Sequence, residues 1–152
     1  MKNLMTLALT LTLTASAALA GDHMSQIANH ARDLATDYRK MTVTLKDKRF
    51  PTQDLQQEMK EADVALAKVK ELVAEYAAMN PNLSAAQQKD WKMVQDLVTL
   101  LTVFQDRKTE LLAGDNPHKK RGVIQGEALA LVTRATLLEQ TALRLASGTP
   151  QS

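Results

Sequence analysis

The sequence predicts an all-α protein, an antiparallel up-down-up-down four-helix bundle that follows a cleaved signal peptide. Three observations indicate this fold. An apolar run at the N-terminus ends in small residues, four later segments repeat apolar residues every three or four positions, and Pro51, Pro81 and Pro117 fall only in the breaks between those segments. The length of 152 residues suits one domain, which we expect over residues 21–152.

Residues 1–20 have the pattern of a secretory signal peptide. Lys2 precedes an apolar run from Leu4 to Leu13, and the small residues Ala18 and Ala20 stand just before Gly21. A transmembrane helix needs about 20 consecutive apolar residues, and this run is shorter. We therefore expect cleavage before Gly21, a periplasmic or secreted protein, and no transmembrane anchor.

The first two helices of the bundle are predicted from amphipathic stripes, in which apolar residues are spaced three or four apart. The first stripe consists of Ile27, Ala31, Leu34, Tyr38, Met41 and Leu45. The second lies between Thr52 and the break at residues 80–82, and consists of Leu55, Met59, Ala62, Leu66, Val69, Val73 and Tyr76. Each stripe predicts one buried helix face.

The third and fourth helices follow from the same spacing. Ser84 and Gln87 form a capping-box pattern before the third, whose stripe up to Gly114 consists of Val94, Leu97, Leu101, Phe104 and Leu111. The fourth stripe consists of Ile124, Ala128, Leu131, Ala135, Leu138, Ala142 and Leu145. Gly148 follows, where a helix end commonly has positive φ. Because the breaks are short, consecutive helices are expected to pack antiparallel, each roughly 35 to 45 Å long.

Composition excludes several chemistries. The chain has no cysteine, so it cannot form a disulfide, a cysteine-ligated zinc site or a covalent c-type haem. The hydrolase, metalloprotease and nucleotide-binding motifs are also absent, as is the Glu-x-x-His pair of di-iron bundles. We therefore expect no enzymatic activity. Without Lys2 the chain has 18 basic and 17 acidic residues, and this balance does not suggest a specific nucleic-acid partner.

Histidine spacing argues against a metal site. His23 and His30 are seven residues apart, about 10 Å along a helix, which is too far for two ligands of one ion. His30, Asp33 and Met24 are the best candidate ligands, since His30 and Asp33 have a suitable spacing. A histidine at the edge of a helix is more often simply solvated, so we expect no metal and no cofactor.

In outline, a periplasmic four-helix bundle with Met24 in its first helix resembles the cytochrome b562 type. That resemblance implies a haem held between a methionine near the start of the first helix and a histidine near the end of the fourth. Here His118 precedes the fourth helix and therefore lies at the opposite end. A haem ligated by His30 alone remains an alternative.

After cleavage the chain keeps five methionines, whose thioethers could hold Cu(I) if they converged. Met41 and Met59 are expected near one end of the bundle, and Met24, Met79 and Met93 near the other. A single cluster is therefore not predicted, and we expect these side chains to fill the core.

Basic residues gather where the first helix ends and the fourth begins. In the predicted topology these segments share one end of the bundle, and Arg107 and Lys108 are expected there too. We name as the basic pole Lys46, Lys48, Arg49, Lys119, Lys120 and Arg121. Positive charge at a helix N-terminus conflicts with the helix dipole, so a bound anion would be favourable. The alternative is a solvated basic loop.

The third and fourth helices have more apolar residues than one seam uses. The third contains Leu97, Val98, Leu100, Leu101, Val103 and Phe104, and the fourth adds Leu129, Val132, Leu137 and Leu143 to its seam. We expect Leu129, Leu137 and Leu143 to form an interaction face for a protein partner or a second copy. The alternative is a wide seam with scattered exposed leucines.

Together these patterns predict an exported, non-enzymatic binding protein with an apolar partner face and a basic pole that contacts an anionic surface. The alternative is a cytochrome b562-like bundle that holds haem or a metal for electron transfer or ligand carriage.

Overall fold

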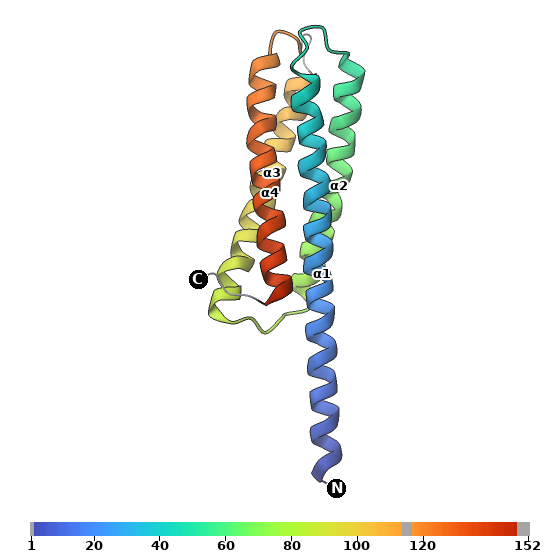
Figure 1. Ribbon diagram of the computed structural model, residues 1–152, viewed down its shortest axis with the longest axis vertical. Helices are drawn as coiled ribbons and strands as arrows, with labels where there is room; N and C mark the ends of the chain where they lie inside the picture. Colours follow the sequence, from blue (N-terminus) through green and yellow to red (C-terminus); the bar gives the residue numbers. More distant parts are fainter. Residues whose placement is uncertain (1, 114–116, 149–152) are drawn as a thin grey trace.

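The chain is seen here as a computed structural model that describes residues 2–113 and 117–148, with side chains from Leu19 onward. It consists of four helices, α1 (Lys2–Thr44), α2 (Thr52–Ala78), α3 (Ala85–Ala113) and α4 (Arg121–Ser147) (Figure 1). No strand occurs within the described residues. The all-α prediction is therefore confirmed.

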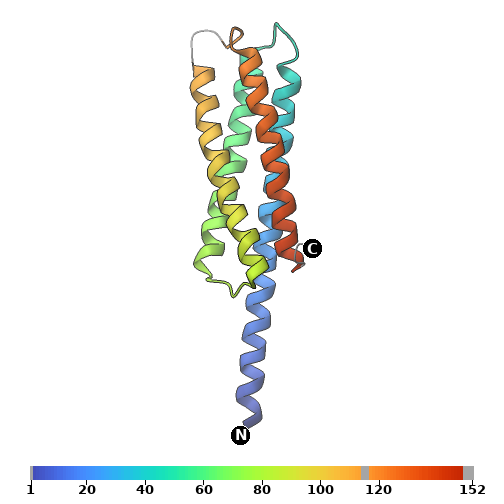
Figure 2. The same cartoon turned by 90° about the vertical axis from the view of Figure 1, so that its left-hand side faces the viewer.

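The four helices pack side by side as in a bundle. α1 contacts both α2 and α4, whereas α3 contacts α4 and, least closely of all, α2. The α1–α2 loop and residues 117–120, which precede α4, lie at one end, and the α2–α3 loop lies at the other (Figures 1 and 2). The loosest packing is therefore between α2 and α3.

Residues 2–20 continue α1 without a break and extend beyond the other three helices (Figure 1). The sequence predicts that these residues belong to a cleaved signal peptide outside the bundle, whereas the structure places them in the same helix as residues 21–44. Among the residues whose side chains are described, Ala20 is the first that lies against the core, and a Cβ added at Gly21 would be 3.7 Å from the carbonyl oxygen of Ala146. Within the part of the chain described, no helix is long and apolar enough to cross a membrane. Gly114, expected just after the third helix, and the side chain of Ala18, expected at the cleavage site, lie outside the part of the chain that is described.

The predicted stripes of α1 and α4 are buried along their whole length. In α2 the prediction holds except at Val73, which is half-buried, while its neighbour Leu72 is buried. These three helices therefore present the faces that their apolar spacing predicts.

The predicted stripe of α3 is wrong in its second half. The residues buried on α3 beyond Leu101 are Gln105, Lys108 and Leu112, whereas Phe104 and Leu111 are half-buried. The buried positions keep a regular spacing of three and four, so the seam itself is uninterrupted. A search for apolar residues alone passes over Gln105 and Lys108, because their polar groups are buried with partners.

The start of α3 and the end of α4 have the local structure that the sequence predicts. The backbone N–H of Gln87 donates to Ser84 Oγ at 3.3 Å, and the N–H of Ser84 donates to Gln87 Oε1 at 3.0 Å, which confirms the capping box at α3. Gly148 ends α4 with φ of 66°, a conformation that glycine adopts without strain.

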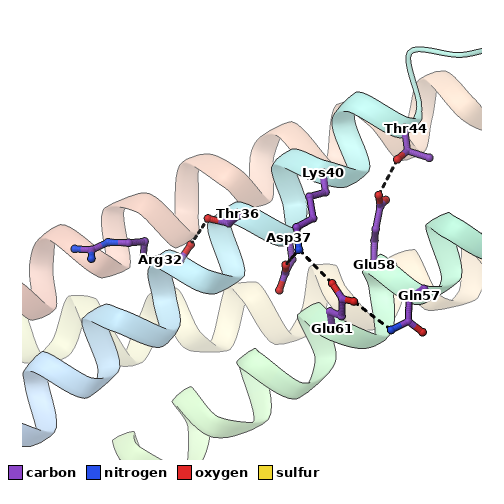
Figure 3. Close-up of polar contacts among 8 residues, drawn as sticks. All are labelled: Arg32, Thr36, Asp37, Lys40, Thr44, Gln57, Glu58 and Glu61. Carbon is purple, nitrogen blue, oxygen red and sulfur yellow. Dashed lines mark hydrogen bonds and ion pairs between the residues drawn. The ribbon is translucent and has the colours of Figure 1, made fainter.

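The flank between α1 and α2 is held by polar contacts (Figure 3). Lys40 pairs with Asp37 at 2.9 Å and with Glu61 at 3.3 Å, and the Thr44 hydroxyl donates to Glu58 at 2.7 Å. Burial raises the pKa of the Glu58 carboxyl. This side of the bundle is thus rich in charge.

Candidate functional site

The outer face of α4 differs from this flank because it has no charge. Its exposed residues are Gly122, Val123, Gly126, Leu129, Thr133, Leu137, Gln140, Leu143 and Ser147. The three leucines expected at an interaction face are 53%, 39% and 42% exposed at positions 129, 137 and 143. The structure therefore places all three predicted leucines on the surface of one helix.

The charged residues of α4 all contact the neighbouring helices. Toward the α1 side, the Arg121 guanidinium donates to the carbonyl oxygen of Leu45 at 2.8 Å, and Glu139 pairs with Arg32 at 2.7 Å. Toward α3, the contacts are Glu127 with Arg107 at 2.9 Å, Arg134 over the Phe104 ring at 4.2 Å, and Arg144 with Asp90 at 3.0 Å. These contacts leave the side of α4 that faces solvent without charge.

Gly126 lies on this uncharged side in the interior of the helix, where glycine costs about 1 kcal/mol relative to alanine, and Gly122 lies on the same side in the first turn. A Cβ added at either glycine would meet nothing within 4 Å. Packing inside the chain therefore does not require glycine at these positions.

The exposed residues also form a second stripe along α4. We call this stripe the α4 face, and it consists of Gly122, Gly126, Leu129, Thr133, Leu137, Gln140, Leu143 and Ser147. Its members are three or four residues apart, the spacing with which one helix packs against another. α4 thus has one stripe in the core and a second that points outward.

The structure brings the two parts of the basic pole to one end. The Phe50 ring in the α1–α2 loop stacks on His118, with 4.3 Å between ring centroids. Five members of the pole are exposed, whereas Arg121 is half-buried by its bond to Leu45. This end of the bundle carries charges of both signs, since Asp47 also lies in the loop, where it accepts a hydrogen bond from the Arg49 N–H at 2.8 Å.

The prediction that Lys108 belongs with this exposed basic end is wrong, because its side chain has no exposed surface. Its Nζ donates to Met41 Sδ and to Met59 Sδ, both at 3.4 Å, and lies 4.5 Å from the centre of the Tyr38 ring. Burial lowers the pKa of Lys108 to about 7, against the opposing charges of Asp63 and Glu127. Lysine is in the core because residue 108 continues the α3 seam.

Hydrogen bonds among polar side chains extend from Tyr38, which lies beside Lys108, to Asp63. The Tyr38 hydroxyl donates to Gln105 Oε1 at 2.8 Å, and Gln105 Nε2 donates to Asp63 Oδ1 at 2.6 Å. Asp63 and Met59 also line a groove of ≈ 260 Å³, whose other lining residues are Gln56, Lys60, Thr109, Leu112 and Ala113. Met59 is therefore shared between the groove and the Lys108 contact.

The candidate metal ligands, although no metal is expected, can be checked for convergence. Met24 is buried, whereas His30 lies 3.8 Å from Asp33 at the surface. No group of three His, Asp or Glu side chains suited to a metal occurs in the described residues. Met24 precedes Leu45 by about 30 Å of helix, and Arg121, three residues after His118, contacts Leu45. Met24 and His118 thus lie too far apart to ligate one haem.

No protein-family model, curated protein or solved structure matches this chain. Similarity therefore assigns no role to the α4 face, the basic pole or Lys108. Their own geometry and chemistry indicate what each can bind.

Proposed function

We propose that this chain is exported and acts by binding rather than by catalysis, with a second copy of itself as its partner at the α4 face. In this proposal residues 1–20 are a signal peptide, and the mature chain from Gly21 is an up-down-up-down bundle in the periplasm or outside the cell. One observation supports the binding role above all others. None of the exposed residues of α4 is charged.

An uncharged helix face favours a helix as its partner. Exposed positions on a helix of a monomer are normally polar or charged, and contiguous apolar surface indicates an interaction site. The charged residues of α4 contact its neighbours, so a partner helix can approach the face without desolvating a charge. The spacing of the face suits helix packing over a helix about 40 Å long.

The order of large and small residues along the α4 face favours an antiparallel pair. Gly122 and Gly126 lie near its start and Leu143 lies near its end, with Thr133 close to the middle. When two copies of α4 run antiparallel about a two-fold axis level with residues 134 and 135, just beyond Thr133, Leu143 of each copy faces Gly126 of the other. This pairing gives the glycines a packing role that the single chain does not.

Charge favours the same orientation. Lys119, Lys120 and Arg121 precede and begin α4, so a parallel pair would bring the basic poles of two copies together. An antiparallel pair separates them by the length of the helix. It also aligns the two helix dipoles favourably.

The basic pole has a separate role in this proposal, which is contact with an anionic surface. Its exposed lysines and Arg49 come from two loops that meet at Phe50 and His118. Because this end lies away from the middle of α4, the pole stays accessible in the antiparallel pair.

Sedimentation equilibrium of the purified protein tests the self-association. We expect the wild-type protein to have the mass of a dimer, and Leu137→Glu to have the mass of a folded monomer, because the substitution places a charge in the interface. Val64→Glu is the matched control, since Val64 is 67% exposed on α2 and should not affect association. A wild-type protein that stays monomeric at high concentration would contradict the proposal, as would equal dissociation of both variants.

A further inference from the structure

The Lys108 amino group has an unusual set of neighbours. Two thioether sulfurs lie within 3.4 Å of Nζ, and the face of the Tyr38 ring lies on another side. No carboxylate within the described residues forms an ion pair with Lys108 at 4.0 Å or less. The amino nitrogen is thus held by soft, polarisable, neutral groups.

The distances among these donors suit a small metal ion. An ion bound to nitrogen at about 2.0 Å and to sulfur at about 2.3 Å holds the two donor atoms about 3.5 Å apart at a tetrahedral angle. Both Nζ–Sδ distances are 3.4 Å. Each nitrogen–sulfur pair is therefore already spaced as it would be around one bound ion.

The donor set selects the kind of ion. Thioethers are soft ligands that favour Cu(I), whereas magnesium, calcium and manganese favour oxygen. Below about pH 7, the lowered pKa of Lys108, Nζ carries one positive charge in this interior, 4.5 Å from the centre of the Tyr38 ring. A monovalent ion that replaces one proton of the ammonium leaves the net charge of this interior unchanged, while a divalent ion would add a charge.

We propose that Met41, Met59 and Lys108 form a binding site for Cu(I), with two thioether sulfurs and the neutral amine of Lys108 as ligands. Binding displaces one proton, so that Lys–NH3⁺ and Cu⁺ give Lys–NH2–Cu⁺ and H⁺, and copper is neither oxidised nor reduced. Asp63 from α2 and Glu127 from α4 supply negative charge to the surroundings of the site.

The proposed entry path lies between α2 and α3, the pair of neighbouring helices that packs least closely. The groove of ≈ 260 Å³ between them is lined by Met59 and by Asp63. A cation attracted by Asp63 would reach the Met59 sulfur first. Movement of the Gln105 side chain, which bonds Asp63 at 2.6 Å, would then open the way to Lys108.

Metal binding can be tested with Ag(I), which has the charge and the ligand preference of Cu(I) without its redox chemistry. The purified protein is titrated with Ag(I) in competition with a chelator, and Cu(I) is then measured anaerobically with a cuprous indicator. We expect one ion per chain. Met41→Leu and Met59→Leu should each weaken binding at least tenfold, while keeping the size of the side chain.

Two further variants identify the nitrogen ligand and the position of the site. Lys108→Leu should weaken binding at least tenfold, whereas Lys108→Met should retain it, because methionine replaces the amine with a third thioether. Met93→Leu is the control, since Met93 contacts Thr141 rather than Lys108.

The methionine methyl signals in NMR give a readout that does not depend on affinity. Ag(I) should shift the signals assigned to Met41 and Met59 and leave that of Met93 in place. Absence of stoichiometric binding would overturn the proposal, as would binding that is unchanged in both Met41→Leu and Met59→Leu.

Discussion

The amino nitrogen of Lys108 lies 3.4 Å from the sulfur of Met59, at a place where the lysine side chain has no exposed surface. Burying a charge with only neutral partners is unfavourable, so folding disfavours the protonated form of this amine. Its pKa is lowered to about 7 for this reason. The stability of the protein should consequently depend on pH.

The free energy of unfolding should rise by a few kcal/mol between about pH 7 and pH 10. In this range the unfolded chain keeps the proton of Lys108, whose ordinary pKa is 10.5, while the folded chain has lost it. Because the unfolded state binds more protons in this range, raising the pH destabilises it relative to the folded state. Above about pH 10 the trend should reverse, because burial raises the pKa of Tyr38 and the unfolded chain loses its phenol proton first.

Urea unfolding of wild type and Lys108→Met at several pH values measures this effect. The variant should be more stable than wild type at pH 6.5, and its stability should lack the rise between pH 7 and 10. A wild-type stability that falls across this range would contradict the burial of a lysine with a lowered pKa.

The fold was predictable to the extent that buried residues are apolar. The stripes of α1 and α4 and the capping box at Ser84 follow from spacing and local chemistry, both of which a sequence displays. Gln105 and Lys108 were missed because their burial depends on partners from other helices, namely Tyr38, Met41, Met59 and Asp63. Continuing the spacing of three and four residues beyond Leu101, without regard to residue type, would have placed positions 105 and 108 in the core.

The candidate surfaces were predictable in part. A surplus of leucines on the fourth helix pointed to an interaction face, and Leu129, Leu137 and Leu143 are exposed. The absence of charge on this face depends on tertiary contacts such as Arg32 with Glu139, which spacing along one helix does not reveal.

Core substitutions should separate seam positions from surface positions. Leu66→Ala and Leu101→Ala should each lower the free energy of unfolding by about 2 to 5 kcal/mol, because both side chains are buried. Gln56→Ala, at an exposed position on α2, should change it by less than about 0.5 kcal/mol. Chemical denaturation measures all three, and similar small losses would contradict the packing described above.

The basic pole should act independently of self-association. Lys119→Gln together with Lys120→Gln should weaken retention on anionic lipid vesicles and leave the oligomer intact. Arg121 is left unchanged, because its bond to the Leu45 carbonyl links α4 to the end of α1. Retention of the wild type should fade with added salt, since charges are screened over about 8 Å at physiological ionic strength. Wild-type protein that does not bind anionic lipid vesicles at low salt would contradict this role.

Export should remove residues 1–20. Mass spectrometry of the protein recovered from the exported fraction should identify Gly21 as its first residue, because Ala18 and Ala20 supply the small side chains that the cleavage site needs. The folded body should remain intact, since every buried core residue in the described part of the chain lies at Met24 or beyond. Full-length protein in that fraction, still beginning at Met1, would show that this segment is retained.

Cross-linking through single cysteines tests the antiparallel pairing of the α4 face most directly, because the chain has no cysteine of its own. Thr133→Cys lies near the proposed two-fold axis, whereas Gln140 residues of two copies would be about 16 Å apart along the helices. We expect a short bismaleimide to join two copies of Thr133→Cys and to leave Gln140→Cys, and the control Val64→Cys on α2, as single chains. Equal cross-linking of Thr133→Cys and Val64→Cys would contradict self-association through α4, and equal cross-linking of Thr133→Cys and Gln140→Cys would contradict the antiparallel orientation.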